Sequence, residues 1–307
     1  MKDLIKQEIL AGLLAQPKRT SPKYFYDQRG SELFEAITHT PEYYVTRTEI
    51  GIYRACRKEL GELVGTQSCL IEYGSGSSRK IRLLLNAIRP RVYVGIDISR
   101  DFLNDAVAAL GRDHPGLITH AVCADITQPF GLPANLSGLT KVAFYPGSSI
   151  GNFEPVQAAE FLGRIAKTVG TGGELIIGVD RKKETKVLEA AYNDDERLTE
   201  RFNLNILSHL NTQLNADFDL AQFKHVAGYN HSLGCIQMFL ESVTDQSVTV
   251  AGEKIEFVRG EKLHTENSYK YHPDEFLNMA AAAGFTLVRH WTDTDEYFSV
   301  YLLKVGV

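Results

Sequence analysis

The stretch CLIEYGSGSSRK, residues 69–80, decides the fold of this chain. A largely apolar strand ends there in a glycine- and serine-rich turn, and a helical pattern over residues 78–88 follows. Glycines directly after a strand let a ligand approach the backbone without meeting a Cβ atom, and the first turn of a helix offers unpaired N–H groups. The stretch therefore predicts a strand–turn–helix unit with room for a ligand at its turn.

The same alternation continues toward the C-terminus. We expect further strands over 92–99, 118–125, 141–149 and 173–180, with helices over 101–110 and 154–168. Nearly continuous apolar strands that alternate with amphipathic helices are typical of a parallel sheet covered on both faces. The end of the chain returns to this style, and its strands 285–291 and 297–305 are expected to form an antiparallel edge of that sheet.

The segment after residue 183 does not follow the alternation. One long helical region, 184–214, precedes strand-like segments that have no helices between them, over 223–229, 235–243, 248–252, 254–260 and 262–271. The first 47 residues have helical patterns around an aromatic-rich stretch at 24–26. This organisation predicts an inserted domain of helices and antiparallel strands.

Composition excludes several classes of protein. Of 307 residues, 44% are hydrophobic and 23% are charged, which are the proportions of a folded chain. Lys and Arg total 33 against 38 Asp and Glu, and the net charge of -5 argues against nonspecific binding to nucleic acid or to an anionic membrane. The N-terminus lacks a signal-peptide pattern, and no apolar run approaches the roughly 18 residues of a membrane span. We therefore expect a soluble cytoplasmic protein.

Cysteine and histidine spacing gives no sign of a metal site. The four cysteines lie far apart, and none of the nine histidines forms an HxxxH or HExxH pair. Cys69 and Cys123 lie inside apolar runs, which predicts buried thiols in a reducing compartment. The basic run Arg181-Lys182-Lys183 is interpreted as a solvated turn.

The turn after the first strand favours one class of cofactor over another. It holds Gly74, Ser75 and Gly76 directly after Glu72, but the dinucleotide fingerprint needs a third glycine where Arg79 stands. NAD and a nicotinamide-dependent dehydrogenase are therefore disfavoured. S-adenosylmethionine fits better, because it has no pyrophosphate to cradle.

Two carboxylates extend this interpretation. Asp97 ends the second strand, where it can accept both hydroxyls of a ribose, and Asp125 ends the third, where it can accept from an adenine amino group. The carboxyl ends of parallel strands meet at one edge of the sheet, which is where such sheets bind ligands. Together with the turn, the two acids indicate a nucleoside-type cofactor.

Several longer runs identify a family. The chain closely resembles the histidine-specific Nα-methyltransferases in PKYFYDQRGSELFEAITHTPEYYVTRTE (22–49), EYGSGSSRK (72–80), FYPGSSIGNF (144–153), AAYND (190–194), RFNLNIL (201–207) and HTENSYKY (264–271). The resemblance spans nearly the whole chain. It implies a monomer that uses S-adenosylmethionine to trimethylate the α-amino group of L-histidine, giving hercynine in ergothioneine biosynthesis.

The resemblance also implies a fold and two domains. The fold is α/β, with the Rossmann-like class I methyltransferase arrangement of a mostly parallel seven-stranded sheet and an antiparallel edge, plus an inserted α+β domain. The cofactor-binding domain would comprise 48–182 and 271–307. The substrate-binding domain would comprise 1–47 and 183–270.

Residue roles are carried over position by position. The implied catalytic positions, beside the amine, are Tyr43 and Asn152. The other implied substrate contacts are Tyr26, Gly147, Tyr192, Met238, Glu266 and Ser268. The implied cofactor contacts are Tyr26, Gly74, Ser75, Gly76, Lys80, Asp97, Asp125 and Ile126. Ile126 stands where the family commonly has Phe, but it still offers apolar contact to a purine.

These residue types suit methyl transfer to an amine. The lone pair must lie in line with the S–CH3 bond, so positioning and desolvation can supply much of the catalysis. Neutral groups such as Asn152 and Tyr43 hold the amine without stabilising its charged form, as a carboxylate would. Glu266 can accept an imidazole N–H while Tyr26 contacts the other ring nitrogen. Two alternatives stay open, namely another amino acid such as a tryptophan derivative, and a cofactor-binding module without catalysis.

Overall fold

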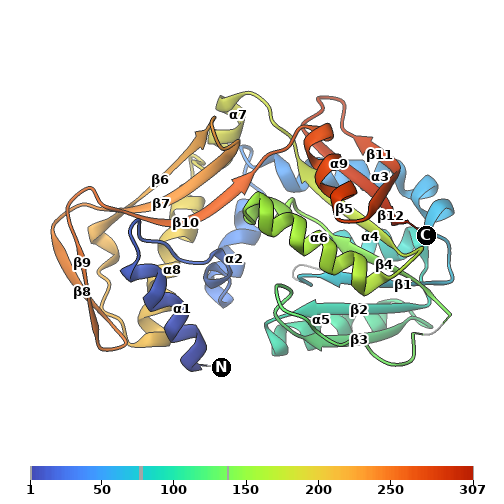
Figure 1. Ribbon diagram of the computed structural model, residues 1–307, viewed down its shortest axis with the longest axis horizontal. Helices are drawn as coiled ribbons and strands as arrows, with labels where there is room; N and C mark the ends of the chain where they lie inside the picture. Colours follow the sequence, from blue (N-terminus) through green and yellow to red (C-terminus); the bar gives the residue numbers. More distant parts are fainter. Residues whose placement is uncertain (1, 76–78, 137, 307) are drawn as a thin grey trace. The chain divides into compact units, whose positions relative to one another are not determined.

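The computed structural model describes residues 2–75, 79–136 and 138–306. The chain divides into two compact units, of which unit 1 is Met1–Tyr44 with Lys183–Tyr269, and unit 2 is Val45–Lys182 with Lys270–Val307. The predicted divisions after residues 47, 182 and 270 compare with divisions after 44, 182 and 269 in the structure. Figure 1 labels the elements of both units.

Unit 2 contains a seven-stranded sheet. Its strands, in spatial order, are β11 (Phe285–Thr292), β12 (Phe298–Val305), β5 (Glu174–Asp180), β4 (Thr140–Tyr145), β1 (Ser68–Tyr73), β2 (Val92–Asp97) and β3 (Ile118–Cys123). Neighbours from β5 to β3 pair in parallel, whereas β12 pairs antiparallel with both β5 and β11. The predicted Rossmann-like α/β sheet with an antiparallel edge is therefore confirmed.

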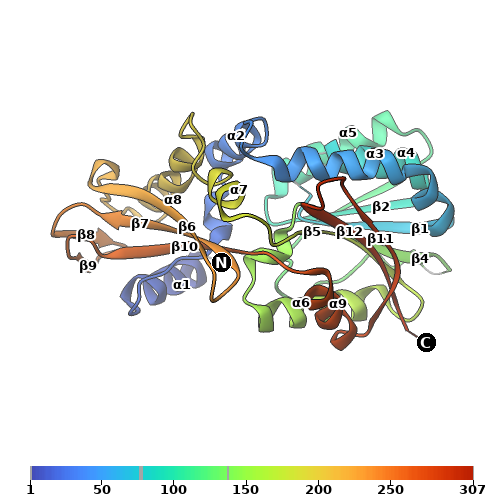
Figure 2. The ribbon, with the colours of Figure 1, turned by 90° about the horizontal axis from the view of Figure 1, so that it is seen from above.

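Helices cover both faces of this sheet, as Figure 2 shows. One face carries α3 (Tyr44–Val64), α4 (Arg79–Ile88) and α5 (Arg100–Asp113), and the other carries α6 (Pro155–Val169) and α9 (Pro273–Ala282). The strands β1 and β5 are buried along their whole length. Apolar strands enclosed in this way direct the polar residues at their carboxyl ends to one edge of the sheet.

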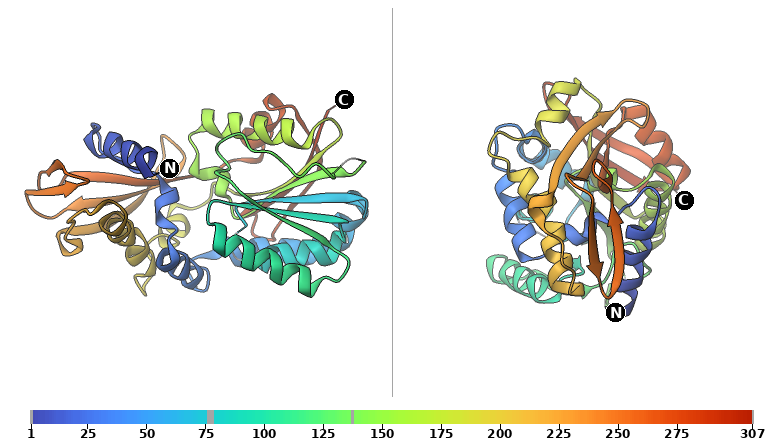
Figure 3. Two further views of the ribbon diagram at one scale, coloured as in Figure 1. Left: turned by 90° about the horizontal axis from the view of Figure 1, so that it is seen from below. Right: turned by 90° about the vertical axis from the view of Figure 1, so that its left-hand side faces the viewer.

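Unit 1 is built on a three-stranded antiparallel sheet, β10 (Lys262–Tyr269), β7 (Cys235–Ser242) and β6 (Phe223–Asn230). Figure 3 shows helices on both sides of it. The remaining elements are the helices α1 (Lys2–Leu14), α2 (Gln28–Ile37), α7 (Thr185–Ala190) and α8 (Leu198–Leu214), the 3-10 turns η1 (Pro22–Phe25) and η3 (Leu220–Gln222), and the hairpin of β8 (Gln246–Val250) and β9 (Glu253–Phe257).

The long helical region expected over 184–214 contains two helices, because the chain breaks between α7 and α8. The side chain of Asp194 caps the second helix and accepts the backbone N–H groups of Leu198 and Thr199 at 2.7 and 2.8 Å. Those bonds lower the pKa of the Asp194 carboxyl although its burial acts in the opposite direction. Arg197, just before α8, takes a left-handed φ of 56° that a continuous helix would not allow.

Two smaller expectations fail. Cys123 is exposed at the end of an edge strand, whereas Cys69 is buried, and both thiols are free. The basic run after β5 is not a solvated turn. Arg181 pairs with Glu296 at 3.1 Å, Lys182 pairs with Glu275 at 2.6 Å, and Lys183 donates to the Tyr44 hydroxyl at 2.7 Å. Within the described ranges no helix is long and apolar enough to cross a membrane.

Candidate active site

The glycine-rich turn of unit 2 folds back onto the neighbouring strand. Gly74 takes φ +76°, a conformation that favours glycine, and a Cβ atom there would meet nothing within 4 Å. The N–H groups of Gly74 and Ser75 both donate to the Ile96 carbonyl at 2.9 Å. Gly76 lies outside the described residues. The turn thus leaves open space over Gly74, at the edge where a cofactor is expected.

A hydrogen-bond relay lies beneath this turn. The Tyr93 hydroxyl donates to Glu72 Oε2 at 2.6 Å, and Ser75 Oγ lies 2.8 Å from the same hydroxyl oxygen. Because the single phenol proton goes to Glu72, the Ser75 hydroxyl is the donor to Tyr93. Burial raises the pKa of Glu72 to about 7, against the lowering effect of Tyr93, Ser75 and Lys80. Tyr93 lies inside an apolar strand, so its part in this site has no signal in the sequence.

The two strand-end acids shape their own loops. Asp97 Oδ1 accepts the Ser99 N–H at 2.9 Å, and burial raises the pKa of the Asp97 carboxyl. Asp125 Oδ1 accepts both the backbone N–H and the hydroxyl of Thr127, at 2.8 and 2.6 Å. Ile126 is half-buried beside it. Each acid is therefore held by bonds to its own loop, at the edge of the sheet where a ligand is expected.

Lys80 and Gly147 meet on a residue that the sequence reasoning missed. Glu49, in α3, accepts the Gly147 N–H with both oxygens at 3.0 Å and is ion-paired with Lys80. The Glu49 side chain is completely buried. Glu49 is the last residue of the stretch 22–49 that resembles the methyltransferase family, and nothing else in the sequence marks it.

Asn152 is presented by a turn at the carboxyl end of β4. It ends the 3-10 turn η2 (Ser149–Asn152), which begins just after Ser148 in a left-handed conformation with φ +57°. The Ser148 hydroxyl accepts the Asp180 N–H at 2.9 Å, and the Asp180 carboxylate pairs with Lys270 at 2.8 Å with both side chains buried. These bonds hold the start of the turn to β5, and Asn152 remains half-buried at its end.

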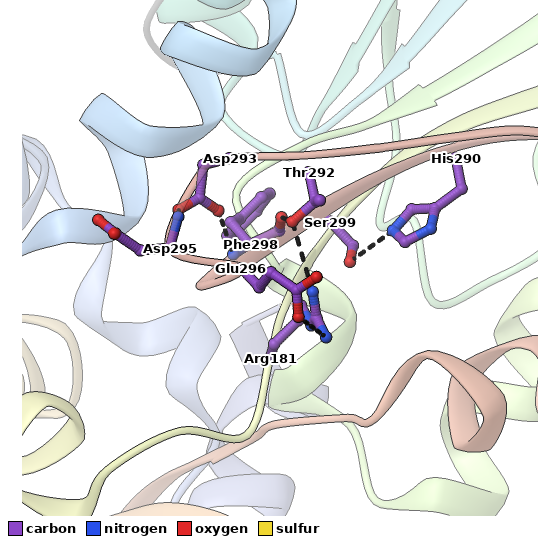
Figure 4. Close-up of polar contacts among 8 residues, drawn as sticks. All are labelled: Arg181, His290, Thr292, Asp293, Asp295, Glu296, Phe298 and Ser299. Carbon is purple, nitrogen blue, oxygen red and sulfur yellow. Dashed lines mark hydrogen bonds and ion pairs between the residues drawn. The ribbon is translucent and has the colours of Figure 1, made fainter.

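The hairpin loop between β11 and β12 lies beside the carboxyl end of β5 (Figure 4). Arg181 ion-pairs with Glu296 and also donates to Thr292 Oγ1 at 3.4 Å. Asp293 accepts the backbone N–H of Phe298 at 2.8 Å. Asp293 and Glu296 are therefore engaged in ordering this loop.

In unit 1 the predicted tyrosines form a continuous aromatic cluster. Tyr26, 40% exposed, meets Phe34 edge-on with ring centroids 5.8 Å apart. Phe34 in turn meets Tyr43 at 6.0 Å, and Tyr43 meets Tyr192 at 6.4 Å. The hydroxyl of Tyr192 then donates to Ser268 Oγ at 2.8 Å. The structure thus links four predicted substrate residues, Tyr26, Tyr43, Tyr192 and Ser268.

Asp27 and Gly30, which follow Tyr26 in the sequence, stabilise the local fold. Asp27 caps α2, where its Oδ1 accepts the Gly30 N–H at 2.6 Å and the Asn205 amide at 2.8 Å. A Cβ atom at Gly30 would overlap the Phe25 carbonyl oxygen. These contacts fix the turn that carries Tyr26, which explains why the run contains Asp and Gly at these places.

The remaining predicted substrate residues lie on two paired strands. Glu266 of β10 is directly opposite Met238 of β7, and Ser268 is opposite Ile236. Residues two apart on a strand point to the same face, so Glu266, Ser268 and Met238 share one face of the sheet. All three are buried, with at most 7% of each residue exposed. A buried carboxylate on this face can select a ligand that donates to it.

His225 supports Tyr192 from behind and was also missed. Its Nδ1 lies 2.8 Å from the Asn203 amide nitrogen, and its Nε2 lies 3.0 Å from the Tyr192 carbonyl oxygen. Asn203 Oδ1 accepts from Thr265, which orients the amide so that its nitrogen faces His225. His225 is therefore the neutral Nε2–H tautomer, in agreement with the lowering of its pKa by burial.

Each unit thus groups its own share of the predicted residues. Unit 1 holds Tyr26, Tyr43, Tyr192, Met238, Glu266 and Ser268, whereas unit 2 holds Gly74, Ser75, Lys80, Asp97, Asp125, Ile126, Gly147 and Asn152. In the part of the chain that the structure describes, no group of three or more His, Cys, Asp or Glu side chains could hold a metal ion.

Known proteins resemble this chain along almost its whole length. A family model described as histidine-specific methyltransferase, SAM-dependent, matches residues 5–305. A histidine N-alpha-methyltransferase of Mycolicibacterium smegmatis is 39% identical over 306 residues, 98% of this chain and 94% of that protein. One from Mycobacterium tuberculosis is 36% identical over 304 residues, 97% of this chain and 94% of that protein. Ergothioneine biosynthesis protein 1 of Neurospora crassa is 30% identical over 92% of this chain, which spans 32% of that protein.

Proposed function

We propose a reaction on one premise: this chain belongs to the family of histidine-specific methyltransferases that depend on S-adenosylmethionine. The reaction is the stepwise transfer of three methyl groups to the α-amino group of L-histidine, which gives hercynine. The observation that carries the proposal is the match of the whole chain to this family, joined to a buried carboxylate, Glu266, on the face of unit 1 that holds the predicted substrate residues. The name of the Neurospora relative supports a place in ergothioneine biosynthesis.

Unit 2 has the features that the cofactor requires, and we assign it the role of cofactor-binding domain. The space over Gly74 fits a ligand close to the backbone, and we assign Ser75 and Gly76, the next residues in the sequence, to the cofactor as well. Asp97 and Asp125 suit the ribose hydroxyls and the adenine amino group, with Ile126 against the purine. Lys80 suits the carboxylate of the amino-acid tail, and Tyr26 is assigned a further contact. When bound, S-adenosylmethionine supplies an electrophilic methyl group on its sulfonium sulfur.

Tyr43 and Asn152 are assigned to the amine and act by positioning. Their neutral side chains can hold the nitrogen after it loses its proton, whereas a carboxylate would stabilise the ammonium form and oppose reaction. Each methylation removes one N–H donor, so the contacts to the amine must be replaceable. Hydroxyl and amide groups meet that need, since they form single neutral hydrogen bonds.

The rest of unit 1 is assigned to the amino acid itself. Glu266 accepts an imidazole N–H, Tyr26 contacts the other ring nitrogen, and Met238 lines the same face. Tyr192 and Ser268, already joined by a hydrogen bond, are assigned with Gly147 to the surroundings of the substrate amino and carboxylate groups. The family match favours histidine over the alternative of a tryptophan-derived substrate.

The setting of the reaction is also proposed. A zwitterionic substrate needs no charged surface to recruit it, which agrees with the small net charge of -5. We propose a cytoplasmic monomer that requires neither nucleic acid nor membrane. Size-exclusion chromatography with light scattering tests the monomer directly.

A competition reaction tests the substrate. The protein is incubated with S-adenosylmethionine and a mixture of the twenty amino acids, and the products are identified by mass spectrometry. We expect a gain of three methyl groups on histidine alone. Methylation of another amino acid, or of none, would contradict the substrate assignment, and binding of S-adenosylhomocysteine in the same preparation would show that the cofactor assignment still stands.

A further inference from the structure

One buried charge joins residues that the proposed function assigns to two different ligands. Glu49 has no exposed surface, and its carboxylate receives contacts from three sides. The Gly147 N–H donates to both oxygens at 3.0 Å, the Lys80 ammonium is ion-paired with Oε2, and the Tyr53 hydroxyl donates to Oε1 at 3.2 Å. Lys80 opens α4, and Gly147 follows β4, so the partners come from segments far apart in the sequence.

The sheet is shaped to admit this carboxylate. A Cβ atom at Gly178 in β5 would overlap Glu49 Oε1, so the strand has a glycine where the carboxylate approaches it. A buried ion pair is weak support for stability, because removing two charges from water offsets much of their attraction. A charge kept in such a place is better explained by what it holds in position.

Glu49 holds a backbone turn as well as a side chain. Gly147 and Ser148 are consecutive left-handed residues, with φ of +79° and +57°, and they lead directly into the turn that ends at Asn152. For a residue other than glycine this conformation is strained, so it persists only where surrounding contacts fix it. Both oxygens of Glu49 on one N–H group fix the orientation of that peptide.

We propose that Glu49 is a positioning residue that fixes, through one carboxylate, both the Lys80 ammonium and the 147–152 turn. This inference rests on the proposed function, in which Lys80 contacts the cofactor while Gly147 and Asn152 contact the substrate. Lys80 has a long flexible side chain, and an ammonium paired with Glu49 loses less freedom when a ligand carboxylate arrives. The same carboxylate keeps the Asn152 amide where the amine must lie.

The test is a double-mutant cycle with two readouts. Glu49→Gln keeps the size of the side chain and one acceptor oxygen but removes the charge. We expect the KM for S-adenosylmethionine and the KM for histidine each to rise about tenfold, the effect of losing one charged hydrogen bond. In a Lys80→Met background the effect on the cofactor KM should vanish, whereas the effect on the histidine KM should remain. Calorimetric binding of S-adenosylhomocysteine should repeat the cofactor half of the cycle without catalysis.

The matched control is Glu174→Gln. Glu174 is also a buried glutamate of unit 2, but it begins β5 at the opposite edge of the sheet. Its variant should leave both KM values within about twofold of the wild type, a change of less than 0.5 kcal/mol by the relation of about 1.4 kcal/mol per tenfold. If Glu49→Gln fails to fold, Glu49→Asp keeps the charge but is too short to reach both partners, and should give the same pattern with smaller changes.

Three results would overturn the inference. The first is equal KM values in Glu49→Gln and Glu174→Gln for both substrates. The second is simple additivity of the effects of Glu49→Gln and Lys80→Met on S-adenosylhomocysteine binding, and the third is unchanged S-adenosylhomocysteine binding in Lys80→Met. Wild-type protein that binds S-adenosylhomocysteine but does not methylate histidine would instead overturn the proposed function and the substrate half of this inference. The double-mutant cycle measured by S-adenosylhomocysteine binding would still test whether Glu49 positions Lys80.

Discussion

The hydroxyl of Tyr93 donates a 2.6 Å hydrogen bond to Glu72 and receives one from Ser75 at 2.8 Å. All three residues are buried. This relay joins the start of β2 to the turn after β1, so it determines which way the Ser75 hydroxyl points. A serine that donates inward presents its lone pairs to a ligand above the turn.

Tyr93→Phe should therefore weaken cofactor binding indirectly, through the orientation of Ser75. The variant removes the hydroxyl that donates to Glu72 and accepts from Ser75, which costs about 1–3 kcal/mol in the free energy of unfolding. We expect calorimetry to show S-adenosylhomocysteine binding about tenfold weaker, since Ser75 can then reorient. Tyr301→Phe, at another buried tyrosine of the same sheet, is the control and should bind as the wild type does. Equal affinity in Tyr93→Phe and Tyr301→Phe would remove the relay from the cofactor site.

Glu72 should make stability depend on pH in a defined window. Its pKa is about 7 in the folded protein against 4.5 for an ordinary glutamate. Between these values the unfolded chain has released a proton that the folded protein retains, so rising pH favours unfolding, and above about 7 the effect is complete. Glu72→Gln removes this dependence. From about pH 5 to about pH 8 the melting temperature of the wild type should fall relative to that of Glu72→Gln. A constant difference between the two proteins across that range would show that Glu72 ionises normally.

His225 should remain neutral below its ordinary pKa, because its folded pKa is lowered. Asn203 donates to Nδ1, so a proton there would face another donor, and burial lowers the pKa of the ring. An unfolded histidine gains a proton near pH 6.5, so the stability that His225 contributes is present above that value and is lost as pH falls toward the folded pKa. Imidazole nitrogen NMR should report the Nε2–H tautomer at neutral pH. Detection of an Nδ1–H signal would contradict the arrangement.

Glu266 should decide which side chain is accepted. Glu266→Gln replaces a carboxylate with an amide of the same size, which weakens acceptance of an imidazole N–H. We expect kcat/KM for histidine to fall about 10- to 100-fold, the cost of a hydrogen bond to a charged group, while activity on bulkier aromatic amino acids changes less. Glu253→Gln, at an exposed position that begins β9, should leave both activities unchanged. Normal histidine selectivity in Glu266→Gln would mean that another residue recognises the imidazole.

The sequence predicts well those parts of the fold that depend on residues close together in the chain. The strand before Gly74 and the strand that ends at Asp97 are apolar runs bounded by turn residues, and both occur where expected. The break before α8 was missed because it depends on a cap from Asp194, a residue type that also occurs within helices. Cys123 lies in an apolar run but on an edge strand, and strand order is a property of the whole sheet.

The candidate site divides in the same way. Tyr192 and Ser268 lie 76 positions apart, yet sequence runs marked both, and the structure joins them by a hydrogen bond. Glu49 and Tyr93 could not be found from local sequence, because their significance depends on partners brought near them only by folding. Composition and spacing do not show which residues from distant parts of the chain will contact the same buried polar group.

Tandem mass spectrometry of the product made from L-histidine tests the central claim most directly. The protein is supplied with excess S-adenosylmethionine, and the product is fragmented to locate its methyl groups. The account predicts three methyl groups on the α-nitrogen and an unmodified imidazole ring, because Glu266 and Tyr26 are assigned to the ring while Tyr43 and Asn152 are assigned to the amine. A methyl group on a ring nitrogen, or unmodified histidine, would contradict it.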